Sequence, residues 1–281
     1  MQNLGYYNGK IGLIEEMSIP MGDRACVFGD GVYDATYSKN HIIYNLEEHV
    51  DRFFSSAAKL KIEPPCTREA LCQLLTDLVK KVDDGEQFVY FQITRGTAPR
   101  DHAFPDVKAN LWVLLRPKKT SDNRVPVKLI TLEDTRFLHC DIKTLNLIPS
   151  VMAAQLAKEA GCNEAVFHRS GRVTECAHSN VSIIENGVFV TAPTDNLILP
   201  GIARANLIKA CKALDIPVSE TPFTVERMMN ADEIIVSSCG SFCLSASHID
   251  GKPVGGKRGD LLEKLRVYLE ADFERVTNPK A

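Results

Sequence analysis

A polar stretch from Arg116 to Arg124 divides the chain into two halves, and each half has the makings of a folded domain. Both halves contain short runs rich in β-branched and aromatic residues, which favour strands. Both also contain longer segments whose apolar residues recur at helical spacing. Strands and helices intermix without strict alternation, so the pattern predicts two α+β domains. We place the first domain at residues 1–116, a linker at 117–124 and the second domain at 125–281.

Four segments of the first half have clear periodicity, and we expect helices at 45–60 and 67–82 and strands at 88–94 and 110–115. Asn45 is suited to cap the first of these helices. Asn8-Gly9 ahead of an apolar run predicts an opening hairpin. Residues 95–107 form a polar, proline-bearing loop, and loops of that length inside compact domains are often functional.

The second half shows the same mixture of elements. We expect strands at 125–132, 165–167, 181–184, 188–192 and 234–238, and helices at 150–160, 200–214 and 261–273. Gly161 is placed to end the first of these helices, and Asn186-Gly187 predicts a tight hairpin turn.

Charge and composition exclude several classes of protein. The 33 basic and 36 acidic side chains give a net charge of −3, which provides no field for binding nucleic acid or an anionic membrane surface. No apolar run approaches the length of a membrane span, and the first seven residues lack the features of a signal peptide. The nine cysteines are odd in number and do not suggest a disulfide scaffold, so we expect reduced thiols in a cytoplasmic protein.

Two ionisable residues of the second half stand among apolar neighbours. Lys143 lies just before a predicted helix, and an apolar setting would lower its pKa, as an amine that forms a Schiff base requires. A solvated surface lysine is the simpler interpretation. Glu175 lies between strand-like segments, where a carboxylate needs a cationic or proton-donating partner. The simplest partner is a local arginine such as Arg172.

Two glycine-containing turns have the composition of an anion site. At Gly201 a helix begins, so the backbone N–H groups of Ile202 and Ala203 are available to an anion. Ser238-Cys239 ends a predicted strand with small polar side chains. Each turn alone is commonly structural, but together, after a lysine and a carboxylate, they indicate a phosphate site. Arg52 lies off the apolar stripe of its helix and is either solvated or directed toward a cleft between domains.

The long loop of the first half carries Arg95, Arg100 and His102. An arginine binds a carboxylate through two parallel hydrogen bonds, which suits an acidic substrate. The alternative is a solvated basic loop.

These segments, in this order, resemble the fold-type IV family of pyridoxal-phosphate enzymes, and within it the D-amino-acid aminotransferases. The resemblance covers nearly the whole chain, and the lysine segment and the Arg-Gly…Arg-x-His segment carry most of its specificity. It implies a smaller N-terminal domain, a larger C-terminal domain and pyridoxal 5′-phosphate at their interface. It also implies a transamination between a D-amino acid, D-alanine by resemblance, and a 2-oxo acid such as 2-oxoglutarate.

The resemblance assigns roles to individual residues. Lys143 matches the lysine that bonds to the cofactor and moves the substrate Cα proton, and Glu175 matches the carboxylate that pairs with the pyridine nitrogen. The residues matching the phosphate site are Arg52, Ile202, Ala203, Ser238 and Cys239. The residues matching the family's site for the substrate carboxylate are Tyr33, Arg100 and His102. Because the Arg-x-His loop of the family comes from the neighbouring subunit, a homodimer is implied.

The chain departs from the family at Ala203 and Cys239, where threonines are usual, so cofactor binding is expected to depend more on backbone N–H groups and Arg52. His178 precedes Asn180 where D-specific relatives often carry serines, and it either faces the cofactor or fills space. Two siblings remain open: a branched-chain L-amino-acid aminotransferase, which would not need Arg100 and His102, and an aminodeoxychorismate lyase. A cysteine-based metal or redox module is disfavoured because the chain has no C-x-x-C, and we expect no metal.

Overall fold

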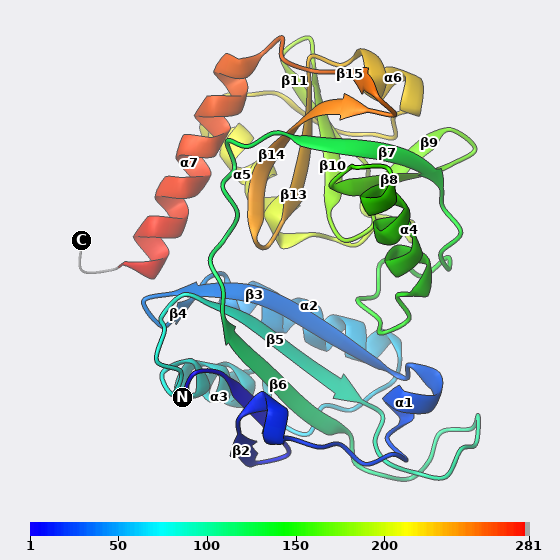
Figure 1. The fold of residues 1–281 in the computed structure, drawn as a ribbon, viewed down its shortest axis with the longest axis vertical. Helices are drawn as coiled ribbons and strands as arrows, with labels where there is room; N and C mark the ends of the chain where they lie inside the picture. Colours follow the sequence, from blue (N-terminus) through cyan, green and yellow to red (C-terminus); the bar gives the residue numbers. More distant parts are fainter. Residues whose placement is uncertain (279–281) are drawn as a thin grey trace. The chain divides into compact units, whose positions relative to one another are not determined.

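A computed structural model describes residues 1–278, and they form two compact units (Figure 1). The first unit contains residues 1–120, 142–146 and the chain from 273 onward, and the second contains 121–141 and 147–272. The break after Thr120 falls within the stretch that we expected to be a linker. Residues 142–146 and 273–278 belong to the first unit, although both segments lie within the predicted second domain.

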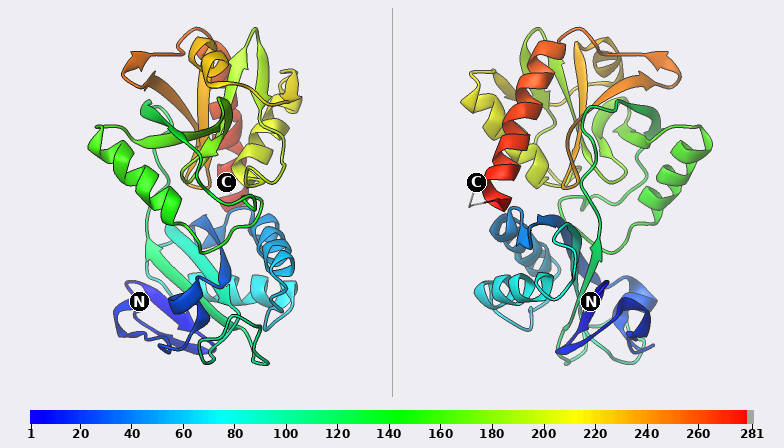
Figure 2. Two further views of the ribbon diagram at one scale, coloured as in Figure 1. Left: turned by 90° about the vertical axis from the view of Figure 1, so that its right-hand side faces the viewer. Right: turned by 60° about the vertical axis from the view of Figure 1, so that its left-hand side comes forward.

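The first unit is an antiparallel sheet covered by helices. Its six strands have the order β2-β1-β6-β5-β3-β4. The strands are β1 (Leu4–Tyr7), β2 (Lys10–Gly12), β3 (Gly31–Lys39), β4 (Ile42–Ile43), β5 (Gln87–Thr94) and β6 (Asn110–Pro117). The helical segments are η1 (Ile14–Glu16), α1 (Arg24–Phe28), α2 (Leu46–Lys59) and α3 (Arg68–Val79). In Figure 2, α2 and α3 lie together on one face of this sheet.

The apolar stripes of α2 and α3 form the core of this unit with the central strands. Phe53 of α2 packs edge-on against Phe91 of β5, with ring centroids 5.0 Å apart. The two helices begin differently: Thr67 Oγ1 accepts a hydrogen bond from the N–H of Ala70, whereas Asn45 adopts a left-handed φ of 52° and makes no side-chain cap. Asn45 therefore precedes α2 as predicted, but its expected capping role is wrong.

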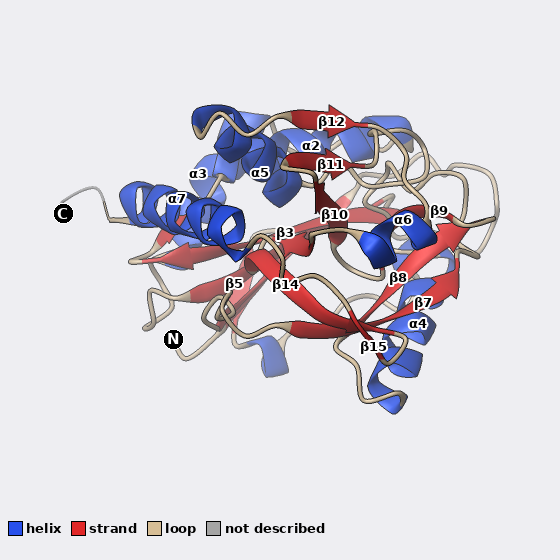
Figure 3. Ribbon diagram, turned by 90° about the horizontal axis from the view of Figure 1, so that it is seen from above, coloured by secondary structure: helices blue, strands red, loops and turns tan. Residues whose placement is uncertain are grey.

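The second unit is built on a nine-stranded mixed sheet (Figure 3). Its order is β12-β11-β10-β13-β14-β7-β8-β9, with β15 added alongside β14. The strands are β7 (Val127–Glu133), β8 (Glu164–Arg169), β9 (Arg172–Cys176), β10 (Asn180–Glu185), β11 (Val188–Thr191), β12 (Val218–Glu220), β13 (Glu233–Ser238), β14 (Ser241–Ile249) and β15 (Lys252–Pro253). The helices are α4 (Ile148–Glu159), α5 (Ile202–Ala213), α6 (Val225–Asn230) and α7 (Gly259–Thr277), of which the last turn belongs to the first unit.

The predicted helices and strands of the second half are confirmed, with two additions that matter for function. Gly161 follows α4 with a left-handed φ of 67°, and Asn186 and Gly187 have positive φ angles at the β10–β11 turn, as expected. The additions are β9, which carries Glu175, and β14, which pairs with β13 beyond the Ser238-Cys239 turn. Among residues 1–278, none of the helices combines the length and apolar character that crossing a membrane requires.

Candidate active site

Lys143 is held at the end of β3 in the first unit. Its carbonyl accepts a hydrogen bond from the N–H of Tyr33 (3.0 Å), and its own N–H donates to Ser56 Oγ on α2 (3.2 Å). The ammonium nitrogen lies 4.5 Å from the centroid of the Tyr33 ring, a cation–π distance. Lys143 is half-buried. The structure brings Lys143 and Tyr33 together.

Arg52 belongs to a buried ionic cluster rather than to the solvated surface. Its Nε and Nη2 donate to the two carboxylate oxygens of Asp34, each at 2.8 Å. His49 Nδ1 lies 2.7 Å from Asp34 Oδ1, the oxygen that Arg52 Nη2 also contacts, and 3.5 Å from Arg52 Nη2. The Asp34 side chain has no exposed surface, whereas that of Arg52 is 11% exposed. We name Asp34, His49 and Arg52 the Asp34 cluster.

The charges of the Asp34 cluster determine its protonation. Burial alone would raise the pKa of Asp34, but Arg52 and His49 outweigh burial and hold that pKa well below its usual range. Burial lowers the pKa of His49, and the nearby cations Arg52 and Lys143 lower it further, against the opposite effect of Asp34. At neutral pH the cluster therefore contains an ionised carboxylate, a neutral imidazole and a guanidinium fixed in one orientation.

The arginines of the long loop have different roles. Arg95 is buried, donates to Asp30 Oδ2 (2.9 Å) and to the carbonyls of Leu60 and Lys61, and so anchors the base of the loop. Arg100 and His102 are exposed. Their described contacts are with Phe28, whose ring centroid lies 5.0 Å from the Arg100 guanidinium and 5.2 Å from the imidazole.

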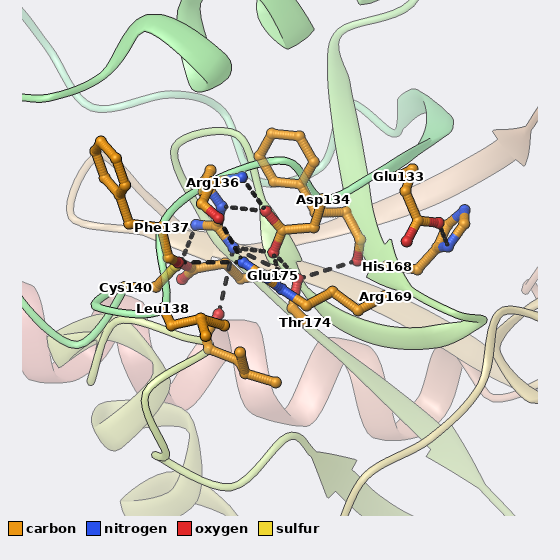
Figure 4. Close-up of polar contacts among 12 residues, drawn as sticks. Glu133, Asp134, Arg136, Phe137, Leu138, Cys140, His168, Arg169, Thr174 and Glu175 are labelled. Atoms are coloured by element: carbon orange, nitrogen blue, oxygen red, sulfur yellow. Dashed lines mark hydrogen bonds and ion pairs between the residues drawn. The ribbon is translucent and has the colours of Figure 1, made fainter.

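Glu175 is the central carboxylate of the second unit, but its partner is not the one expected. Arg136 Nη1 donates to Glu175 Oε1 (Figure 4). Glu175 Oε2 accepts from Asn180 Nδ2 and from the N–H of Leu199, each at 3.0 Å. Arg172 instead pairs with Asp195. Arg172 is not the partner because it lies on the same strand as Glu175. Residues three apart in a strand point to opposite faces, so the two side chains diverge.

The two turns predicted to bind phosphate both lie in the second unit. Gly201 provides no side-chain cap to α5, so the first N–H groups of the helix, including those of Ile202 and Ala203, keep their anion-binding capacity. A Cβ on Gly201 would come within 1.8 Å of Asn180 Oδ1, so only glycine fits there. Ser238 ends β13 beside the turn at Cys239, and α5 packs against β13 and β14. The buried Ser237 hydroxyl has no hydrogen-bond partner among the described residues.

His178 does not fill space in the core. Its side chain is 66% exposed and contacts Glu164 and Ser179, with Nδ1 lying 3.1 Å from Glu164 Oε1. Burial raises the pKa of Glu164, which accepts hydrogen bonds from the N–H of His178 and from Ser179 Oγ. The nine cysteines are free thiols, and burial raises the pKa of Cys140 and of Cys176. Within residues 1–278, no group of three or more His, Cys, Asp or Glu side chains is arranged to hold a metal.

Comparisons with known proteins define the family. The model of the amino-transferase class IV family matches residues 31–249, and the chain belongs to this family. A D-alanine aminotransferase of Listeria monocytogenes serotype 1/2a is 38% identical over 269 residues, which cover 93% of each chain. One from Staphylococcus haemolyticus is 36% identical and covers 95% of this chain and 98% of its own.

Solved structures confirm the expected fold-type IV, α+β architecture. The Escherichia coli branched-chain amino acid aminotransferase has a TM-score of 0.90 at 20% identity, covering 100% of this chain and 97% of its own. The T.th. branched-chain amino acid aminotransferase with pyridoxamine 5′-phosphate has a TM-score of 0.89 at 25% identity, covering 97% and 94%. The first of these likenesses concerns the fold alone.

Sequence reasoning missed the supporting residues of both units: Asp34, His49, Asp134 and Arg136. Asp34 lies between Tyr33 and Ala35, and a carboxylate with apolar neighbours in a strand was a usable signal, because a buried charge needs a partner. Asp134 and Arg136 stand in an irregular segment after β7, where no periodicity shows which side chains point inward. Only the pairing of β7, β8 and β9 brings them to Glu175.

Proposed function

We propose that this protein is a pyridoxal-phosphate-dependent D-amino-acid aminotransferase that exchanges an amino group between D-alanine and a 2-oxo acid, 2-oxoglutarate by resemblance, in a ping-pong reaction. The observation that carries the proposal is the similarity to D-alanine aminotransferases over nearly the full length of the chain. Two of the site residues that the family resemblance selected, Arg52 and Glu175, support it, because each lies in a buried ionic network.

The residues present fit the cofactor. In the first unit, Arg52 is a fixed cation suited to a phosphate, and Lys143 supplies an amine held against an aromatic ring. In the second unit, the uncapped α5 beside Ser238 and Cys239 is also suited to a phosphate, and the unpartnered hydroxyl of Ser237 lies in the same strand end. Pyridoxal phosphate, when bound, supplies a reactive aldehyde and a ring that accepts electrons.

We assign Lys143 Nζ the transfer of the proton at the substrate Cα. The Tyr33 ring and the backbone hydrogen bonds of Lys143 limit where the amine can reach, which is what a stereospecific proton transfer requires. Glu175 would hold the proton on the ring nitrogen of the cofactor. The structure supports this role, because three donors stabilise the Glu175 carboxylate in a buried place.

We assign the substrate carboxylate to Tyr33, Arg100 and His102, with Arg100 and His102 supplied by a second copy of the chain. Within residues 1–278, the contacts of Arg100 and His102 are with Phe28, and neither side chain contacts Tyr33 or Lys143. An exposed basic pair outside its own site supports a homodimer in which each loop serves the partner. The nine free cysteines support a reducing, cytoplasmic location.

A branched-chain L-aminotransferase is the second candidate, because solved structures of that activity share the fold at 20–25% identity. The test is a half-reaction. D-alanine, L-alanine and L-leucine are added separately to the protein loaded with pyridoxal phosphate, and the cofactor absorbance is followed. We expect D-alanine alone to change the spectrum. A faster change with L-leucine would favour the second candidate, and pyruvate released from aminodeoxychorismate would favour the lyase.

Lys143→Ala tests the catalytic assignment within the same assay. Without the proton-transferring amine, turnover of D-alanine should fall by at least about 10²–10⁴-fold. Lys118→Ala is the matched control, because Lys118 also lies over a tyrosine ring of the first unit, 5.9 Å from the Tyr37 centroid. We expect the control to keep wild-type turnover, and an active Lys143→Ala would contradict the assignment.

A further inference from the structure

Arg136 lies between two buried carboxylates of the second unit. Figure 4 shows its guanidinium with Asp134 on one side and Glu175 on the other. Nε and Nη2 donate to the two oxygens of Asp134 at 3.0 and 2.9 Å, and Nη1 donates to Glu175. The side chain of Asp134 has no exposed surface, and those of Arg136 and Glu175 are 13% and 7% exposed.

The orientation of Arg136 is fixed independently of Glu175. The fork to Asp134 sets the plane of the guanidinium, which also lies 4.7 Å above the centroid of the Phe167 ring. Asp134 is held in turn by Thr174 Oγ1 (3.1 Å) and by Arg169 Nε (3.3 Å). Arg169 further donates to the carbonyl oxygen of Arg136 (2.9 Å). The guanidinium of Arg136 is therefore held beside Glu175 by contacts that do not involve Glu175.

The charges around Arg136 affect the ionisation of Glu175. Two carboxylates, Asp134 and Glu175, face two guanidinium groups, Arg136 and Arg169, so the cluster is neutral as a whole. A guanidinium in contact with Glu175 favours the charged form of that carboxylate. If Glu175 shared a proton with a basic nitrogen of a ligand, Arg136 would favour the proton on that nitrogen, because the guanidinium contacts the carboxylate directly.

We propose that Arg136 is a positioning residue that keeps Glu175 ionised and so places the shared proton on the ring nitrogen of the cofactor, with Asp134 fixing Arg136 for that task. This inference rests on the proposed function. It assigns to Arg136 an effect on the electron-accepting strength of the ring, exerted entirely through Glu175. With the cofactor bound, the shared proton would lie between Glu175 Oε and the ring nitrogen, and Arg136 would keep its own proton throughout.

The test compares Arg136→Gln with Arg136→Lys on the protein loaded with ¹⁵N-labelled pyridoxal phosphate. The ¹⁵N chemical shift of the ring nitrogen reports its protonation directly. An adjacent opposite charge changes the proton distribution of a carboxyl group by about 10-fold to 1,000-fold. We therefore expect Arg136→Gln to move the signal toward the unprotonated value and to lower kcat at least about tenfold, with little change in KM for D-alanine. Arg136→Lys keeps the charge and should recover much of the protonated signal.

Arg172→Gln is the matched control, because Arg172 lies on the same strand as Glu175 and pairs with Asp195 instead. It should leave the signal and kcat at their wild-type values. An unchanged ring signal in folded Arg136→Gln overturns the inference. Equal loss of ring protonation in the Gln and Lys variants also overturns it, because the charge would then not be the cause.

A measurement without cofactor separates this inference from the proposed function. In the apoprotein labelled with ¹³C at glutamate side-chain carboxyls, Glu175 is assigned by its absence in Glu175→Gln and is titrated with pH. We expect Glu175 to protonate at higher pH in Arg136→Gln than in the wild type, and an unchanged titration overturns the inference. If Arg136→Gln does not fold, Arg136→Lys, which keeps a cation near Glu175, must retain a titration close to that of the wild type, and protonation of Glu175 at a clearly higher pH in this variant overturns the inference. If the wild-type protein does not turn over D-alanine but the titration of Glu175 differs between the wild type and Arg136→Gln as expected, only the substrate assignment is contradicted.

Discussion

The two units each contain a buried ionic cluster, and the central group of the cluster has the opposite charge in the two units. In the Asp34 cluster, a carboxylate lies at the centre and holds two basic side chains, His49 and Arg52. In the second unit, a guanidinium lies at the centre and holds two carboxylates, Asp134 and Glu175. The first arrangement fixes a cation and the second fixes an anion. We name the group formed by Asp134, Arg136 and Glu175 the Arg136 cluster.

The shared feature of the two clusters is a fully buried aspartate behind the residue with the proposed function. Asp34 and Asp134 have no side-chain exposure, whereas Arg52 and Glu175 retain 11% and 7%. A buried charge is costly unless it is paired and hydrogen-bonded, so each aspartate fixes its partner in one orientation. Arg52 and Glu175, the residues proposed to bind the phosphate and the ring nitrogen, are each oriented by buried charged groups behind them.

Asp34→Asn should have the largest effect on stability. It leaves Arg52 and His49 buried without their anionic partner, and breaking such a pair costs about 3–5 kcal/mol. We expect the free energy of unfolding of the apoprotein, measured in urea, to fall by this amount, and the affinity for pyridoxal phosphate to fall with it. Asp77→Asn, at an exposed aspartate of the same unit, is the control and should be neutral. A loss below about 1 kcal/mol for Asp34→Asn would show that the cluster does not stabilise the unit.

Asp134→Asn should have a smaller effect, because Arg136 keeps Glu175 as a second anionic partner. The loss is then closer to that of charged hydrogen bonds, about 1.5–3 kcal/mol. Urea unfolding of the apoprotein measures it under the conditions used for Asp34→Asn. If Asp134→Asn destabilises more than Asp34→Asn, the two clusters do not differ in the way that their geometry indicates.

Acidification should separate the clusters, because only the Asp34 cluster contains a histidine. Burial lowers the pKa of His49 below its ordinary 6.5, so the unfolded chain binds a proton before the folded one does. Stability contributed by this site is therefore full above about pH 6.5 and is lost as the pH falls below it. The pKa of Asp34 and of Asp134 is lowered instead, despite burial, so their contribution persists above 3.8 and is lost only at lower pH.

Thermal midpoints between about pH 7.5 and pH 4.5 test this order. We expect His49→Gln to flatten the loss of stability just below about pH 6.5. Asp134→Asn should leave the slope in that range unchanged. A slope that is the same in the wild type and in His49→Gln would contradict the assignment of that range to the Asp34 cluster.

Much of the fold could be predicted from the sequence because its elements have local signals. The apolar stripes of α2 and α3, the β-branched runs of β5 and β13, and the Asn186-Gly187 turn each depend on residues close together in the chain. The membership of residues 142–146 could not be predicted in this way. Their place in the first unit depends on a bridge between Thr144 and Val32 and on the contact of Lys143 with Ser56, which join segments about a hundred residues apart in the chain.

The site could be predicted only where a residue type belongs to a motif. Family resemblance selected Lys143, Glu175 and Arg52, and these roles remain predictions. The partners of these residues were inaccessible because partner choice depends on strand pairing. Glu175 on β9 meets Arg136 in the irregular segment after β7, whereas proximity in sequence suggested Arg172. Proximity in sequence is a poor guide inside a strand, because successive residues face opposite sides.

Arg172→Gln should therefore have the smallest effect on the free energy of unfolding. The comparison is with Asp34→Asn, Asp134→Asn and His49→Gln. Arg172 and Asp195 are each about one-third exposed, and ion pairs of that kind contribute about 0–1 kcal/mol. Urea unfolding of the apoprotein should show a loss within that range, and affinity for pyridoxal phosphate should stay at the wild-type value. A loss comparable to that of Asp134→Asn would mean that Arg172 supports the Arg136 cluster after all. The exposed Arg172 and the buried Arg136 would then no longer differ in their effect on Glu175. The ionisation of Glu175 could not be attributed to Arg136 alone.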